Sequence, residues 1–163
     1  MKKILVANRG EIALRVMRTA KKMGIQTVAV YSEVDRHAPH VRFADEAVLL
    51  GPPPSNQSYL LIDKIIEAAK NTGADAIHPG YGLLSENPAF AAACTRNQIA
   101  FVGPIAATLQ QFGEKAAARA IAIEHDVPVL KGTVEPTNLV GAREFFDMLD
   151  GSATPGRRLF RQH

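Results

Sequence analysis

The stretch "KILVANRGEIALRVMRTAKKMGIQTVAVY", residues 3–31, decides the fold. It opens on a short apolar run at residues 3–7, which is typical of a buried strand in a parallel sheet. Over residues 11–23 apolar side chains return at helical spacing, and Gly24 follows as a helix stop. A second apolar run covers residues 26–31. Strand, helix and strand in this order predict a crossover unit that joins two parallel strands. The predicted apolar face of the helix consists of Ile12, Val16, Ala20 and Met23.

The same alternation continues along the chain. Further strands are predicted at residues 46–50, 74–78, 99–103 and 127–130. Further helices are predicted at residues 59–71, 88–97, 105–112, 114–125 and, more weakly, 139–149. Ser58 is expected to cap the helix at 59–71, and Asn87 with Pro88 to begin the next. The pattern predicts an α/β fold with an open, mostly parallel, Rossmann-like sheet and helices on both faces.

Four loops follow predicted strands and are candidates for a ligand site. Ligands of such sheets bind beyond the carboxyl ends of the strands, where the crossovers diverge. The candidate loops are residues 8–10, 31–35, 51–58 and 78–85. Gly10 before a helix allows an anion at the helix N-terminus, but the chain lacks the three-glycine dinucleotide fingerprint and the glycine-rich phosphate loop. A structural turn is therefore the favoured interpretation of Gly10.

The loop "HPGYGLLSEN", residues 78–87, concentrates the polar chemistry. His78 fits either a satisfied histidine at a strand end or a ligand contact, and the two stay open. Ser85 or Asn87 is best explained as a helix cap, and His78, Ser85 and Glu86 do not form a recognisable nucleophilic triad.

Two other features have a possible ligand interpretation. His37 and His40 are three residues apart, but Pro39 interrupts the loop between them, which argues against a zinc site. Lys115 begins a predicted helix, where the helix dipole disfavours a lysine. It is either an exposed lysine or a contact for nucleotide phosphate.

Composition limits the classes of protein that are compatible with the chain. The 163 residues are 47% hydrophobic and 21% charged, as in a globular domain, and no apolar run reaches the roughly 18 residues of a membrane span. No signal peptide is recognisable, and Cys94, the single cysteine, is predicted to be a buried small side chain. A cytoplasmic location is expected. The net charge of +3 resides in residues 151–163, which argues against nucleic-acid binding by the folded body.

Several longer stretches closely resemble biotin carboxylase. They are "ILVANRGEIALRV", "GIQTVAVYSEVDRHAPHVRFADEAVLLGP", "SYLLIDKIIEAAKNTGADAIHPGYGLLSEN", "FVGP" and "FGEKAAARAIA", in order from residue 3 to about residue 132. The family includes the biotin carboxylase subunits or domains of acetyl-CoA, propionyl-CoA, methylcrotonyl-CoA and pyruvate carboxylases. The resemblance implies ATP-dependent carboxylation of the ureido nitrogen of biotin by bicarbonate, through carboxyphosphate and with magnesium.

The resemblance also implies roles for individual residues. Lys115 matches the lysine that contacts ATP, and Tyr81 and Gly82 match residues that border the biotin pocket. Arg15 and Arg18 match arginines of a homodimer contact, although Lys22 replaces a glutamate of some members, which weakens the inference of a dimer.

The resemblance further implies a domain organisation. Residues 1–132 are expected to form the N-terminal α/β domain that precedes an ATP-grasp fold. Residues 133–150 are expected to begin the connection to that fold, and residues 151–163 to be an atypical, flexible tail. The implied partners are a biotin carboxyl carrier protein or domain and a carboxyltransferase.

The resemblance places no catalytic residue and no metal ligand in these 163 residues. The lid, the magnesium-binding glutamates and the bicarbonate-binding residues of the family follow the segment "PVLKG", so the chain alone is expected to be inactive. Two alternatives are a stand-alone binding or dimerisation module and the N-terminal domain of another ATP-grasp ligase, such as a purine-pathway carboxylase or carbamoyl-phosphate synthetase.

Overall fold

The computed structural model describes residues 1–130, 132 and 137–149. The chain divides into two compact units, residues 1–113 and 114–163, and each is described by itself. The atypical tail predicted at residues 151–163 lies outside the described residues. The domain boundary predicted at residue 132 stays a prediction.

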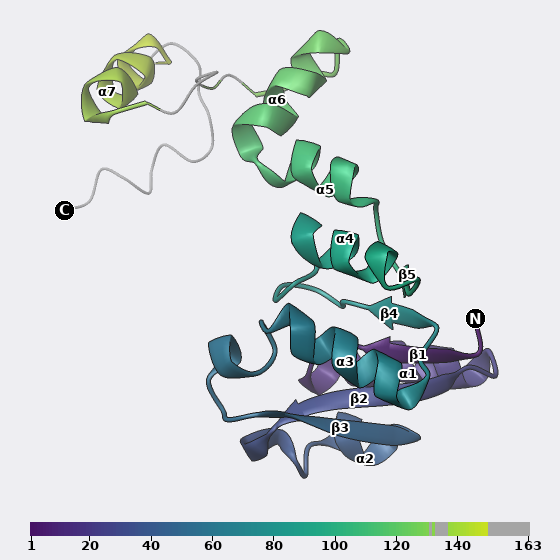
Figure 1. The fold of residues 1–163 in the computed structure, drawn as a ribbon. Helices are drawn as coiled ribbons and strands as arrows, with labels where there is room; N and C mark the ends of the chain where they lie inside the picture. The colour runs from purple at the N-terminus through teal and green to yellow at the C-terminus, as the bar shows by residue number, and fades with distance from the viewer. Residues whose placement is uncertain (131, 133–136, 150–163) are drawn as a thin grey trace. The chain divides into compact units, whose positions relative to one another are not determined.

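The first unit is built on a five-stranded sheet (Figure 1). Its strands are β1 (Lys3–Val6), β2 (Gln26–Ser32), β3 (Glu46–Gly51), β4 (Ala76–His78) and β5 (Ala100–Phe101). Their order across the sheet is β3-β2-β1-β4-β5, and every neighbouring pair is parallel. The predicted fold class, an open parallel sheet in an α/β domain, is confirmed.

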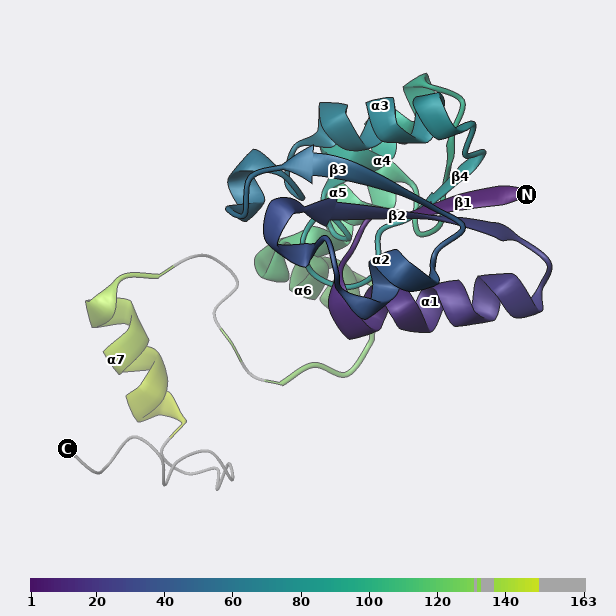
Figure 2. The same cartoon turned by 90° about the horizontal axis from the view of Figure 1, so that it is seen from below.

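Helices cover both faces of this sheet (Figure 2). They are α1 (Gly10–Lys22), α2 (Pro39–Phe43), α3 (Ile62–Thr72), α4 (Pro88–Arg96) and α5 (Ala106–Gly113), with short 3-10 turns η1 (Glu33–Asp35) and η2 (Ser55–Gln57). Helices α1 and α2 pack on one face, and α3 and α4 on the other. Crossovers on both faces bury the central strands on both sides, which is why these strands are continuous apolar runs.

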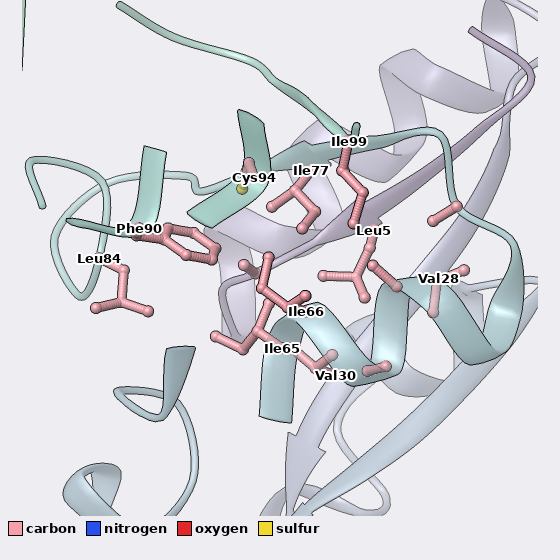
Figure 3. Packing of buried hydrophobic residues seen from close by; sticks show 14 of the residues in the cluster. Leu5, Val28, Val30, Ile65, Ile66, Ile77, Leu84, Phe90, Cys94 and Ile99 are labelled. Atoms are coloured by element: carbon pink, nitrogen blue, oxygen red, sulfur yellow. The ribbon is translucent and has the colours of Figure 1, made fainter. Parts of the chain in front are cut away.

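Successive side chains of β1 point to opposite faces and therefore join different cores. Leu5 packs with α3 and α4, in a cluster that includes Ile65 and Phe90 (Figure 3). Val6 packs with Ala13 and Met17 of α1. Cys94 of α4 is fully buried in the first of these cores, as predicted, and its burial raises the pKa of the thiol to about 11.

The buried face of α1 differs from the predicted one. The structure buries Ala13, Met17 and Ala20, whereas Met23 is 68% exposed at the end of the helix. Small side chains at Ala13 and Ala20 allow the helix to lie close to the sheet, and Met17 fills the space between them. Of the predicted face, Ala20 is buried and Val16 packs partly buried against the core, whereas Met23 is wrong and Ala13 and Met17 were missed.

The two predicted helix caps had different outcomes. Asn87 caps α4, because its side chain accepts hydrogen bonds from the N–H groups of Ala89 and Phe90, and Pro88 is the first helical residue. Ser58 does not cap α3. The helix begins later, at Ile62, and the buried Ser58 hydroxyl donates to the Pro54 carbonyl at 2.9 Å within the preceding turn.

The second unit contains α6 (Lys115–Glu124) and α7 (Leu139–Met148). The strand predicted at residues 127–130 is wrong, since this segment is irregular. A strand requires a neighbour for its backbone hydrogen bonds, and the described part of this unit contains no other strand. Among the described residues of both units, no helix is long and apolar enough to span a bilayer.

Candidate functional site

The carboxyl ends of β1 and β4 meet where the strand order reverses. From β1 the chain proceeds outward through β2 to β3, then returns to place β4 on the other side of β1. Such a switch point is where open α/β sheets bind ligands. The Ala7 N–H donates to the His78 carbonyl at 2.8 Å, so the predicted loops 8–10 and 78–85 start side by side.

Loop 79–82 is tightly turned and presents one aromatic ring to solvent. Gly80 and Gly82 both have left-handed φ values, +66° and +63°. The Gly80 N–H donates to Nδ1 of His78 at 3.0 Å, and burial lowers the pKa of that imidazole. Leu84 anchors the far end of the loop in the core, while Tyr81 remains 75% exposed. The loop backbone is thus held at both ends, while the Tyr81 ring is accessible to solvent.

The Asn8 side chain lies between β1 and this loop. Its Nδ2 donates to the carbonyls of Pro79 at 2.8 Å and Tyr81 at 2.9 Å. Its Oδ1 accepts the Arg9 N–H at 2.9 Å, and the residue is only 3% exposed. Sequence reasoning placed Asn8 in a turn and assigned it no role. The available signal was an amide side chain directly after the strand at the switch point.

A polar network anchors the residue that follows. Arg9 donates to both carboxylate oxygens of Asp35, from Nε at 2.8 Å and from Nη2 at 2.6 Å. The hydroxyls of Tyr59 and Ser32 donate to the same carboxylate, at 2.6 and 3.2 Å. The hydrogen bond from Arg9 lowers the pKa of Asp35 to about 2, and Asp35 in turn raises the pKa of Arg9. Arg9 is therefore paired with Asp35, and this ion pair holds the loop at residues 8–10 in place.

His40 lies beneath the N-terminus of α1. It is fully buried, its Nδ1 accepts the Gly10 N–H at 3.3 Å, and its Nε2 lies 3.4 Å from the Val30 carbonyl. These contacts require a neutral ring that donates from Nε2, and burial lowers its pKa accordingly. One helix N–H that an anion would use is thereby occupied. The residue is not paired with His37 in a metal cluster, and the described residues contain no such cluster.

A cavity of about 360 Å³ opens beside the exposed Tyr81. Arg15 and Thr19 of α1 and Met23, the C-cap of this helix, line one part of it, and His78 and Tyr81 line another. The remaining wall is apolar: Met1, Ile4, Val16, Ala20, Ile25 and Val102. The fold therefore brings together Arg15 and Tyr81, two candidates from separate motifs.

The other candidates lie elsewhere. Arg18 is exposed on α1, and Gly82 lies in the loop beside Tyr81 with open space around its α-carbon. Lys115 belongs to the second unit, where it is the exposed first residue of α6 after the N-cap Glu114. The first unit thus holds Arg15, Arg18, Tyr81 and Gly82, and the second holds Lys115.

A sequence model of the family described as "Biotin carboxylase, N-terminal domain" matches residues 1–109 of this chain. The chain belongs to this family. The match includes the β1–β4 switch point and the HPGYG loop.

Named relatives agree with this family. The chain is 55% identical over 130 residues to the mitochondrial methylcrotonoyl-CoA carboxylase subunit alpha of Mus musculus, covering 80% of this chain and 18% of that one. It is 54% identical over 132 residues to the biotin carboxylase of Halalkalibacterium halodurans, covering 81% and 29%. The chain thus spans less than a third of the length of either relative.

Solved structures of carboxylases share the fold. The biotin carboxylase domain of a single-chain bacterial carboxylase matches 93% of this chain and 35% of its own, with a TM-score of 0.85 and 42% identity. The multifunctional pyruvate carboxylase of Rhizobium etli matches 81% of this chain and 13% of its own, with a TM-score of 0.75 and 52% identity.

Proposed function

We propose that this chain acts as the N-terminal domain of an ATP-dependent biotin carboxylase and supplies one wall of the biotin pocket. The observation that carries the proposal is the HPGYG loop at the switch point of a biotin carboxylase N-terminal domain, with Tyr81 exposed beside a cavity. Tyr81 offers an aromatic face, and the open backbone at Gly82 allows a ligand to approach closely.

The nucleotide role is assigned to the second unit. Lys115 is proposed to contact ATP phosphate, and its exposure at the start of α6 suits a mobile point charge that meets an anion. Magnesium is assigned to glutamates of the ATP-grasp domain found in longer family members. When bound, ATP with magnesium supplies phosphoryl-transfer chemistry. In the proposed function, this chain orients biotin through Tyr81 and Gly82 and holds phosphate through Lys115.

The assembly role is assigned to α1. Arg15 and Arg18 are exposed on this helix and are proposed to contribute to a homodimer contact. In the complete enzyme, a biotin carboxyl carrier domain and a carboxyltransferase are the proposed partners. The relatives include multidomain carboxylases, which supports this assignment.

A domain exchange tests the proposed function. The 132-residue matching region of the Halalkalibacterium halodurans biotin carboxylase is replaced by its counterpart from this chain, a substitution at 54% identity. The chimera is expected to hydrolyse ATP in a biotin- and bicarbonate-dependent manner. Tyr81→Ala is expected to raise the KM for biotin, and Lys115→Ala the KM for ATP. A folded chimera without biotin-dependent turnover would contradict the proposal.

The 163-residue chain by itself provides the matched control. It is expected to show no biotin-dependent ATP hydrolysis, and turnover by the purified chain would contradict the assignment of metal and bicarbonate binding to another domain. Sedimentation velocity and isothermal titration calorimetry together distinguish the proposed enzyme domain from the alternative, a stand-alone dimerisation module. That alternative requires a dimer that binds neither ATP nor biotin and dissociates in the Arg15→Glu, Arg18→Glu double variant.

A further inference from the structure

Asn8 follows β1 at the switch point, where an open α/β sheet normally receives its ligand. We infer that Asn8 is a positioning residue: its side chain amide sets the conformation of loop 79–82 and thereby orients Tyr81 and Gly82 toward biotin. This inference rests on the proposed function for its ligand, but its geometric part concerns only the first unit.

One planar amide makes three hydrogen bonds at this point. Both hydrogens of Nδ2 are used, because Nδ2 donates to the carbonyls of Pro79 and Tyr81, which flank Gly80. The remaining acceptor, Oδ1, receives the Arg9 N–H. A donor that bridges these two carbonyls fixes the peptide planes between Pro79 and Gly80 and between Tyr81 and Gly82. No other neutral side chain of this length offers two donors and one acceptor in one plane.

The loop is shaped to fit this amide. A β-carbon built on Gly80 lies 2.5 Å from Nδ2 of Asn8 and 2.8 Å from its Cγ, closer than real contacts allow. By contrast, a β-carbon on Gly82 meets no atom within 4 Å, although the φ values of the two glycines are nearly equal. The absence of a side chain at Gly80 therefore allows Asn8 to approach the loop. At Gly82 no neighbouring atom occupies the space of a side chain, so the loop is open there.

Asn8 is itself held on both sides. Ala7 is bonded to His78 through the backbone, and Arg9 is locked to Asp35 by two hydrogen bonds. The backbone on both sides of Asn8 is therefore anchored. At Tyr81 the carbonyl accepts a hydrogen bond from Asn8, whereas the ring is exposed.

The first experiment measures the loop in the 163-residue chain. Chymotrypsin cleavage after the exposed Tyr81 is followed by mass spectrometry under native conditions, with cleavage after the buried Tyr59 as a reference for global unfolding. Losing both amide donors is expected to accelerate cleavage at Tyr81 about tenfold in Asn8→Ala and Asn8→Asp. Asp retains the size of the side chain but places a carboxylate against two carbonyls.

The control is Asn97→Ala. Asn97 also donates through Nδ2 to a carbonyl, that of Ala93 at 2.8 Å, at the end of α4. This variant is expected to leave cleavage at Tyr81 unchanged relative to cleavage at Tyr59. Equal acceleration in the Asn8 and Asn97 variants, or none in either Asn8 variant, would overturn the inference.

The second experiment measures the functional consequence in the chimera. Asn8→Ala is expected to raise the KM for biotin about tenfold while the KM for ATP stays within twofold, and Asn97→Ala is expected to change neither. Equal rises in both KM values, or an unchanged KM for biotin, would refute a positioning role. If the chimera with Asn8 intact lacks biotin-dependent turnover, the proposed function fails, and the cleavage rates still decide whether Asn8 holds the loop.

Discussion

The Asp35 network is expected to stabilise the first unit in a pH-dependent way. Replacing Asp35 with Asn removes the carboxylate that binds Arg9, Tyr59 and Ser32. The fold lowers the pKa of Asp35 from 3.8 to about 2, which corresponds to about 2 kcal/mol at about 1.4 kcal/mol per tenfold change. The Asp35 side chain is 12% exposed, but its partner Arg9 is 51% exposed, so solvent screening keeps the value at about 2 kcal/mol rather than above it.

The sign follows from the lowered pKa. As pH falls, the unfolded chain takes up the Asp35 proton before the folded chain does, so the stabilisation is complete above pH 3.8 and is lost toward pH 2. At pH 7 Asp35→Asn is expected to reduce the free energy of unfolding by about 2 kcal/mol. At pH 3 the difference between the two proteins is expected to be about half as large.

Urea unfolding followed by tyrosine fluorescence measures this difference. The chain has no tryptophan, and all three tyrosines, Tyr31, Tyr59 and Tyr81, lie in the first unit, so the signal reports that unit alone. Asp63→Asn, an exposed change on α3, serves as the control and is expected to cost less than about 0.5 kcal/mol. A difference between wild type and Asp35→Asn that stays constant from pH 6 to pH 3 would refute the reasoning.

Three further outcomes are expected. Gly80→Ala should lower the free energy of unfolding by about 3 kcal/mol and Gly82→Ala by about 1, since both strain the backbone but only the first collides with Asn8; equal costs in urea unfolding would contradict this. Because the fold lowers the pKa of His40, stability should fall as pH drops below 6.5, and His40→Asn should flatten the slope of unfolding free energy between pH 7.5 and 5.5; an unchanged slope argues against a buried neutral ring. Cys94 should react with Ellman's reagent at pH 8 about a hundredfold more slowly in the folded chain than in urea, and comparable rates would show that the thiol is accessible.

Periodicity predicted the sheet well because its physical cause is local. Burial produces apolar runs in β1 and β2 and helical spacing of apolar residues in α3. Each of these patterns is visible within about a dozen residues. The buried face of α1 was predicted only in part, because Ala20 is buried and Val16 packs against the core, but Ala13 and Met17 were missed. Close packing against the sheet selects small residues such as Ala13, which a hydrophobicity pattern underrates.

The candidate site likewise has residues that local motifs predicted and long-range pairs that they did not. Tyr81 and Gly82 were identified from a contiguous motif, and Asn87 as a cap from its place before Pro88. The partners of Asn8, in contrast, are 71 and 73 residues away, and Arg9 meets Asp35 across 26 residues. No local pattern in a single sequence records such pairs, because they depend on which strands become neighbours.

The sequence by itself determined an α/β fold with parallel strands, the glycine-relaxed HPGYG loop and the family resemblance. These follow from short-range sterics, burial and recognisable motifs. Only the tertiary structure decided that β4 lies beside β1, and this placement delivers the Asn8 amide to the loop and gathers Arg15 and Tyr81 around one cavity. The physical reason is that strand order is selected by the packing of crossover helices on both faces, a property of the whole sheet.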